Sequence, residues 1–269
     1  VQVMIDTGMT RAGVSLSQTQ YVIQRIQSRP VLQLTAVGTH FANSEIASDP
    51  FTIDQLNRFH QATDALYEQS DGKILRHAAN SGAVFFTPSS HFNLVRPGLA
   101  IYGIDPTGRP NMNRALKPVM KWTAPLIGIR DIPAGTTVGY GQTFCAPRDM
   151  RIGLVPIGYA DGYLRSFSNR GVMLVQGETC PVVGRVSMDL TTIDLTNVPH
   201  ASLGDEITLL DSDPLSSCSV YELAKWADTI PYEILARIGQ RVKRVAVQPQ
   251  DGSDAVVGDE EELLSPDDL

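Results

Sequence analysis

The sequence predicts an α/β domain followed by a β-rich domain in a chain of 269 residues. Two observations lead to this class. Up to about residue 115, short apolar runs alternate with amphipathic helical patterns, which is typical of parallel strands joined by crossover helices. From residue 116 onward, short strand-like runs are separated by glycine, proline, asparagine and aspartate, which indicates an all-β arrangement. We therefore place the two domains at 1–115 and 116–249.

In the first domain, apolar runs predict strands or strand-like elements at 1–5, 31–37, 74–80 and 94–104. A first helix is expected at 16–27, and Pro30 ends it. A second helix is expected at 52–69, where Thr52 and Gln55 form a capping-box start. Its apolar stripe at helical spacing consists of Ile53, Leu56, Phe59, Ala62 and Leu66. This alternation by itself does not distinguish a closed barrel from an open sheet.

In the second domain, strand patterns occupy 122–132, 136–144, 152–159, 172–195 and 206–211. Two late helices interrupt them. One begins at the capping box of Ser219 and Glu222, and the other begins at Pro231. The run at 240–248 predicts a closing strand.

Composition and charge exclude several classes of protein. Apolar residues make up 42% and charged residues 19%, which is typical of a globular chain. No apolar run reaches the roughly 18 residues of a membrane span. The three cysteines are far apart and odd in number, so we expect neither a disulfide framework nor a metal site, and the natural compartment is a reducing cytoplasm.

The net charge of −7 comes from the end of the chain. Residues 251–269 hold eight acidic and no basic residues, which leaves 22 basic and 21 acidic residues before them. The body therefore carries no basic excess that would hold nucleic acid. The acidic tail at 250–269 is predicted to be a solvated, disordered extension, and a role in binding a partner stays open.

Seven segments in order resemble the alanine racemase family, whose fold is an incomplete (β/α)8 TIM-type barrel followed by a C-terminal β-domain. Each segment is short, but their common order makes the resemblance strong. The segments are 4–14, 39–45, 77–83, 92–104, 138–144, 155–165 and 183–195. Because the chain opens with Val1 inside a strand pattern, we expect the family's first barrel third, with the lysine that forms the Schiff base, to precede it.

The resemblance implies a pyridoxal 5′-phosphate enzyme that interconverts L- and D-alanine with two bases, in the supply of D-alanine for peptidoglycan. The cofactor makes the α-proton removable because its conjugated ring accepts the charge of the carbanion. One base would be the family's lysine, which we assign to no residue here. The other would be Tyr140, which lies between two glycines in VGYGQTF. From the residues alone, an ordinary aromatic of a β-strand is the favoured interpretation of Tyr140, and the resemblance reverses this.

A tyrosine with the usual pKa of about 10 is a poor base near pH 7. The resemblance implies that His40 and Arg96 favour the phenolate, as a hydrogen-bond donor and a nearby cation would. It also places Arg96 against the pyridine nitrogen of the cofactor. From the residues alone, His40 is equally a core histidine beside a strand. For Arg96 the alternative is a surface arginine, which its apolar neighbours Leu94, Val95 and Leu99 disfavour.

Further site residues are implied by the same match. Ser81, Gly98 and Leu99 would bind the cofactor phosphate, and Arg11 with the backbone of Met188 would bind the substrate carboxylate. The access channel would involve Tyr159, Arg165 and Arg185. Since the family shares active sites between subunits, a homodimer is implied, and no membrane or nucleic-acid partner is expected. Asp161 and Asp189 lie in the same matching segments, but both could equally be turn residues, which is the commonest role of aspartate beside glycine in a β-domain.

The chain departs from the family pattern at two places. Met4 stands where many members have a lysine, often carbamylated, that positions the arginine, so Arg11 needs another anion, such as chloride or a different carboxylate. The family's late phosphate-contacting tyrosine is expected to fall on Gln240. Two alternatives to racemase activity remain. One is a non-catalytic fragment or binding module without the lysine, and the other is a fold-related pyridoxal-phosphate amino-acid decarboxylase.

Overall fold

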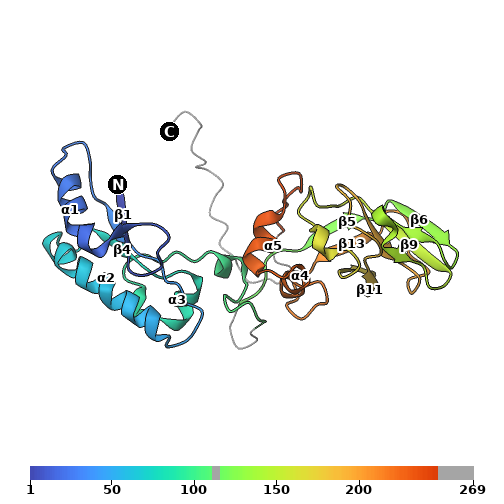
Figure 1. Cartoon of the computed structure of the whole chain (residues 1–269), viewed down its shortest axis with the longest axis horizontal. Helices are drawn as coiled ribbons and strands as arrows, with labels where there is room; N and C mark the ends of the chain where they lie inside the picture. The colour runs from blue at the N-terminus through green and yellow to red at the C-terminus, as the bar shows by residue number, and fades with distance from the viewer. Residues whose placement is uncertain (111–115, 248–269) are drawn as a thin grey trace.

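The computed structural model describes residues 1–110 and 116–247. They form an α/β lobe and a β-rich lobe at opposite ends of an elongated molecule (Figure 1). This arrangement confirms the predicted fold class. The predicted boundary at residue 115 and the acidic tail at 250–269 lie outside the described residues. Within the described ranges, no helix is both long and apolar enough to cross a membrane.

The α/β lobe is built on a parallel sheet with the order β2-β1-β3-β4. Its strands are β1 (Gln2–Asp6), β2 (Val14–Ser15), β3 (Ala36–Gly38) and β4 (Leu75–His77). The crossover helices are α1 (Leu16–Gln27) and α2 (Pro50–Gln69), and α3 (Ser81–Phe86) follows β4. Because the carboxyl ends of parallel strands meet at one edge, the segments after β1, β3 and β4 converge there. Those three segments contain the predicted site residues of this lobe.

Helix α2 starts earlier than the sequence pattern predicts. Asp49 is the N-cap, and its carboxylate accepts a hydrogen bond of 2.7 Å from the backbone N–H of Thr52. The predicted capping box of Thr52 and Gln55 is therefore wrong. Ile53, expected in the apolar stripe, is 46% exposed. The buried face runs instead through Thr52, Gln55, Leu56, Phe59 and Thr63, which turns Ile53 toward solvent.

The β-rich lobe contains two main antiparallel sheets and a small hairpin. The first sheet has the order β11-β10-β13-β5, and the second has the order β12-β9-β6. The strands are β5 (Trp122–Pro125), β6 (Gly128–Ile132), β9 (Met150–Val155), β10 (Val172–Val175), β11 (Glu178–Pro181), β12 (Thr191–Asp194) and β13 (Glu206–Leu210). The hairpin pairs β7 (Thr137–Val138) with β8 (Phe144–Cys145).

The end of the described chain holds two helices. Helix α4 (Val220–Ala227) begins as predicted, because the Ser219 hydroxyl accepts a hydrogen bond from the N–H of Glu222. Helix α5 (Pro231–Arg237) begins at its proline. The predicted closing strand is wrong over residues 240–247, which form no strand. The Arg244 side chain binds backbone carbonyls at 238, 239 and 242, and this folds the segment on itself.

The segment around the 3-10 helix at 99–102 and a few contacts join the lobes. The 3-10 turns are η1 (Pro88–Ser90), η2 (Leu99–Tyr102), η3 (Tyr140–Gln142) and η4 (Arg165–Phe167). From η2, Leu99 packs in the core cluster of the β-rich lobe, as does Ile104 just after it. The Tyr221 hydroxyl accepts a hydrogen bond of 2.9 Å from the N–H of Asp105. The joint is therefore a packed contact.

Gly103 allows a test of this joint. It has φ 71°, and a Cβ there would lie 1.7 Å from the carbonyl oxygen of Lys117. Gly177 has φ 85°, but nothing lies within 4 Å of its would-be Cβ. A left-handed backbone costs a non-glycine residue about 1–2 kcal/mol. We expect Gly177→Ala to lower the free energy of unfolding by about 1 kcal/mol and Gly103→Ala by at least twice that, measured by urea unfolding. Equal losses would show that the contact with Lys117 is unimportant.

Candidate functional site

The guanidinium of Arg96 is the centre of the polar cluster in the α/β lobe. One terminal nitrogen (Nη2) donates to the carbonyl of Thr39 at 2.7 Å and lies 3.3 Å from Nδ1 of His40. The other (Nη1) is in close contact with Nδ1 of His77. Since a guanidinium has no acceptor, His77 must accept through Nδ1 and carry its proton on Nε2. Arg96 therefore sets the tautomer of His77, whereas His40 has a second donor beside its ring, because Nδ2 of Asn80 lies 3.5 Å from its Nε2.

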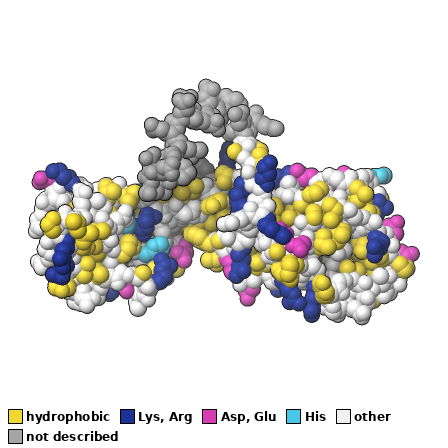
Figure 2. Space-filling view, turned by 90° about the horizontal axis from the view of Figure 1, so that it is seen from above, with side chains coloured by type: hydrophobic (Ala, Val, Ile, Leu, Met, Phe, Trp, Pro, Cys, Tyr) yellow, Lys and Arg dark blue, Asp and Glu magenta, His cyan; other side chains and the backbone are white. Residues whose placement is uncertain are grey.

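Burial and positive charge keep both imidazoles neutral. Burial, and then the charge of Arg96, lower the pKa of His77 to about 4. The pKa of His40 is also lowered by burial, by Arg96 and by Arg11. No carboxylate among the described residues forms an ion pair with Arg96, so its charge faces only neutral partners. Figure 2 shows histidine and basic side chains on the side of the α/β lobe that faces the other lobe.

A glycine on β3 makes room for His77. A Cβ at Gly38 would lie 2.0 Å from Cε1 of the His77 ring, so any other residue would displace the imidazole. Gly38 and His77 are also register partners in the sheet. The position of the Arg96–His77 pair therefore depends on a close approach that only glycine permits.

The loop that carries His40 is held from beneath by Gln55 of α2. The fully buried Gln55 amide donates to the carbonyl of His40 at 3.0 Å and accepts from the N–H of Ala42 at 2.9 Å. It also donates to the hydroxyl of Thr7, which is hydrogen-bonded to Thr39. Sequence reasoning placed Gln55 only in a helix cap. The signal available in the sequence was a glutamine on the same side of the helix as the apolar residues Leu56 and Phe59.

A second polar group forms at the joint of the lobes. Ser81 is 1% exposed, and its hydroxyl accepts hydrogen bonds from the N–H groups of Gly98 at 2.9 Å and Ala100 at 3.2 Å. Asn80, the N-cap of α3, accepts from the N–H of Ala83 at 3.1 Å. Nothing lies within 4 Å of a would-be Cβ at Gly98, so open space borders this group. Leu99, also predicted here, begins η2 and is buried.

The β-rich lobe contributes Tyr232 of α5 to this group. Its phenol lies near the Ser81 hydroxyl. Partial burial raises the pKa of Tyr232, whereas this hydroxyl lowers that pKa. Tyr232, in the first turn of α5, is therefore a candidate for the late tyrosine that was expected at Gln240. Gln240 itself lies beyond α5 and is exposed.

The predicted residues of the β-rich lobe form a separate set. Tyr140 is 72% exposed on a turn between Gly139 and Gly141, whose φ values are 76° and 70°. A Cβ at Gly139 would lie 3.2 Å from the backbone nitrogen of Arg185, and one at Gly141 would lie 3.4 Å from its guanidinium carbon. The two glycines thus bring the Tyr140 turn against Arg185.

Tyr159 and Met188 lie on two further segments in mutual contact. The N–H of Tyr159 donates to the carbonyl of Ser187 at 3.1 Å, and the N–H of Ala160 donates to that of Met188 at 3.0 Å. Both predicted side chains are largely exposed, as is Arg165 on η4. Among the described residues, no hydrogen bond or ion pair joins Tyr140 to His40 or Arg96.

The first loop of the α/β lobe positions Arg11. The Asp6 carboxylate accepts from the N–H groups of Gly8 and Thr10 at 2.9 and 3.0 Å, which lowers the pKa of Asp6 and fixes the loop. Arg11 is exposed, and its charge acts on His40. The Asp6 carboxylate therefore binds its own loop. It is not the anion that Arg11 was expected to need because Met4 replaces the family's lysine.

The chemistry of these donors suits a ligand with a phosphate and a ring nitrogen. Ser81, Gly98 and Tyr232 offer hydroxyl and backbone groups beside open space, and Arg96 offers a cation that no carboxylate neutralises. Among the described residues, no group of three or more His, Cys, Asp or Glu side chains could hold a metal ion. The fold and the site together define a two-lobed protein with a four-stranded parallel α/β lobe, a β-domain and a polar site near their joint.

Comparisons with known proteins identify the family. The family model of the alanine racemase N-terminal domain matches residues 1–106, and that of the C-terminal domain matches residues 119–246. The chain belongs to the alanine racemase family. It is 35% identical to an alanine racemase of Halothermothrix orenii over 91% of this chain and 64% of that protein. It is 38% identical to one of Syntrophobacter fumaroxidans over 89% of this chain and 64% of that protein.

Solved structures agree with this assignment. The alanine racemase of Streptomyces coelicolor A3(2) has a TM-score of 0.83 and 36% identity, and the match covers 93% of this chain and 66% of that one. The alanine racemase of Bartonella henselae, described with covalently bound pyridoxal phosphate, has a TM-score of 0.79 and 32% identity over 91% and 66%. The chain therefore spans about two thirds of these relatives, and its α/β lobe is part of a barrel.

The His77–Arg96 contact predicts a pH dependence of stability. A histidine has a pKa of about 6.5 in an unfolded chain, whereas His77 has a pKa of about 4 when folded. The unfolded chain therefore binds more protons between these values, and stability falls as the pH is lowered. From pH 7 to 4.5, we expect the wild type to lose about 2 kcal/mol more than a His77→Gln variant. Unfolding free energies at several pH values measure this, and parallel curves would refute it.

Proposed function

We propose that the protein is an alanine racemase that uses pyridoxal 5′-phosphate. The observation that carries the proposal is the Arg96 cation between two neutral imidazoles, next to the Ser81–Gly98–Tyr232 group. Pyridoxal-phosphate enzymes often place a carboxylate at the ring nitrogen. A cation there instead keeps the nitrogen unprotonated, which limits the charge that the ring withdraws. This arrangement suits proton transfer at the α-carbon without transfer of the amino group.

Different residues of the site would bind different parts of the cofactor. Ser81, Gly98, Leu99 and Tyr232 would hold the phosphate with their hydroxyls and backbone groups at the joint of the lobes, and the N–H of Gly98, which donates to Ser81, would turn to the phosphate. Arg96 would donate to the pyridine nitrogen. When bound, the cofactor supplies a conjugated ring that accepts negative charge from the α-carbon of the amino acid.

The proposed proton transfer uses Tyr140. Its exposed phenol would give and take the α-proton on one face of the substrate, and a lysine that we assign to no residue here would serve the other face. Arg11 and the N–H of Met188 would bind the substrate carboxylate. Tyr159, Arg165 and Arg185 would line the access channel. His40 and Arg96 would favour the tyrosine phenolate.

Because Tyr140 lies in the β-rich lobe apart from His40 and Arg96, the proposal includes a homodimer. In it, Tyr140 and Met188 of one subunit complete the site of the other. We further propose that the enzyme acts in the cytoplasm and supplies D-alanine for peptidoglycan. The free cysteines support the cytoplasmic placement, because a reducing compartment keeps thiols unpaired.

A direct test is racemase activity of the protein from its complete reading frame. After dialysis against a carbonyl-trapping amine, we expect interconversion of L- and D-alanine to be lost and to return with added pyridoxal 5′-phosphate. Carbon dioxide release from an amino acid would instead support a decarboxylase. Absence of both activities with tight cofactor binding would support a binding module.

The role of Tyr140 predicts an asymmetric defect. In a Tyr140→Phe variant of the same protein, exchange of the α-hydrogen with deuterated solvent should persist for D-alanine and fall for L-alanine by about 10²- to 10⁴-fold. Racemisation must slow in both directions, because the equilibrium constant between enantiomers is one. Tyr21→Phe, on the exposed face of α1, is the matched control. Wild-type exchange from both enantiomers would make Tyr140 a structural residue.

A further inference from the structure

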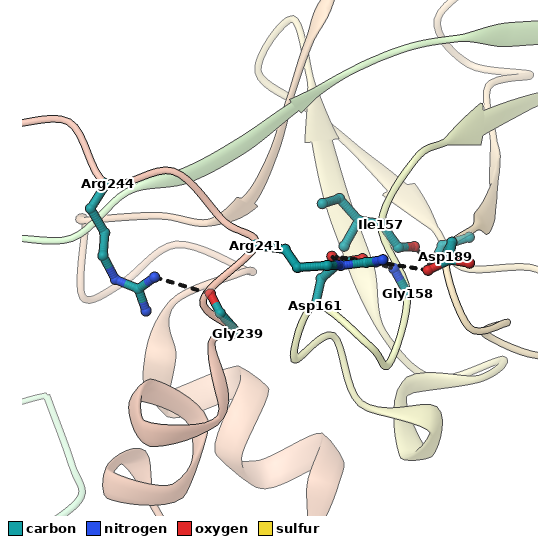
Figure 3. A network of polar contacts seen from close by, with 8 residues as sticks. Ile157, Gly158, Asp161, Asp189, Gly239, Arg241 and Arg244 are labelled. Atoms are coloured by element: carbon teal, nitrogen blue, oxygen red, sulfur yellow. Dashed lines mark hydrogen bonds and ion pairs between the residues drawn. The ribbon is translucent and has the colours of Figure 1, made fainter.

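Arg241 connects two segments that the proposed function places at the substrate. Its Nη2 lies 2.8 Å from a carboxylate oxygen of Asp161 and 2.7 Å from one of Asp189, and its Nε donates to the same Asp161 oxygen at 3.1 Å. Figure 3 shows the guanidinium lying between the two carboxylates. From the sequence, Asp161 and Asp189 could be plain turn residues. In the structure, both are ion-pair partners of Arg241.

Asp161 is the buried end of this network. Its side chain is only 7% exposed, and its second oxygen accepts a hydrogen bond of 3.0 Å from the N–H of Gly158. Asp161 therefore fixes the turn that carries Tyr159. A buried carboxylate needs a paired charge, and Arg241 provides it. Arg241 is thus required for the local form of this turn.

Asp189 is the exposed end, and it directly follows Met188. The Met188 segment and the Tyr159 turn are in close backbone contact, because a Cβ at Gly158 would lie 2.3 Å from the carbonyl oxygen of Met188. Exposed ion pairs on their own contribute little. Here, however, one guanidinium joins both carboxylates and so restrains the Met188 segment relative to the Tyr159 turn.

The segment that carries Arg241 is itself anchored. The N–H of Gly239 donates to the carbonyl of Asp161 at 2.7 Å, and the Arg244 side chain binds the carbonyls of Ile238, Gly239 and Val242. This segment directly follows α5, whose first turn carries Tyr232 to Ser81. It thus runs from the proposed phosphate group to the proposed substrate segments.

We propose that Arg241 is a positioning residue that fixes the Met188 backbone for the substrate carboxylate by holding residues 157–162 and 187–190 together. The proposal rests on the proposed racemase function. The carboxylate is bound equally in the ground state and the transition state, so a displaced Met188 weakens binding without slowing proton transfer. Loss of Arg241 should therefore change KM and leave kcat almost unchanged.

The test compares variants of the protein from its complete reading frame. For Arg241→Gln we expect the KM for alanine to rise about tenfold with kcat within about twofold, since one hydrogen bond to a charged group is weakened. Arg241→Lys keeps the charge and should give an intermediate KM. Arg237→Gln removes an exposed arginine of α5 whose ion-pair partner in the described part of the chain is Glu233, and it should match the wild type.

Two further measurements separate positioning from general damage. In hydrogen–deuterium exchange, amides of 157–162 and 187–190 should exchange faster in Arg241→Gln and not in Arg237→Gln. Asp189→Asn changes an exposed side chain and should raise KM, and combining it with Arg241→Gln should add little, because both changes break one contact. If Arg241→Gln does not fold, the KM of Asp189→Asn decides.

The outcomes distinguish the two proposals. An inactive wild type would refute the racemase function, whatever the variants do. An active wild type with Arg241→Gln equal to Arg237→Gln in KM and in exchange would overturn the positioning role. Additive effects of Arg241→Gln and Asp189→Asn, or a fall in kcat with KM unchanged, would also overturn it.

Discussion

Arg96 places a positive charge inside the α/β lobe among neutral partners, and much of the candidate site depends on how that charge is accommodated. Two imidazoles and a backbone carbonyl receive its N–H groups. The charge in turn helps keep His40 and His77 unprotonated. Accepting groups without negative charge leave the cation available to a ligand, which a paired carboxylate would not. A pyridine nitrogen is a ligand that such a cation suits.

The parallel sheet is what brings these partners together. Thr39 and His40 follow β3, His77 ends β4, and Arg96 arrives later, on the segment that runs beside β4. The close approach at Gly38 and the buried amide of Gln55 hold the two imidazoles in place. The positions of His40 and His77 around Arg96 thus depend on Gly38 and Gln55, which need not touch any ligand.

The joint between the lobes gives the site its second half. Tyr232 reaches Ser81 from α5, and Tyr221 accepts from the backbone of Asp105. The segment after α5 then passes to the Tyr159 turn and the Met188 segment through Arg241. A single stretch of chain therefore contacts both the proposed phosphate group and the proposed substrate segments. Motion at the joint would affect both, which gives the packing of Leu99 and Ile104 a functional consequence.

The sequence by itself determined the features that depend on near neighbours. The span of α1, the cap at Ser219, the start of α5 at Pro231 and the glycines around Tyr140 are all set by local backbone preferences. The family motifs also located Arg96, His40 and Ser81. Which distant groups meet was decided by the tertiary structure, because hydrogen bonds between residues far apart in the chain leave no periodic pattern in it. The fold placed Tyr232 near Ser81, made Asp161 and Asp189 ion-pair partners of Arg241, and replaced the expected closing strand with a segment bound by Arg244.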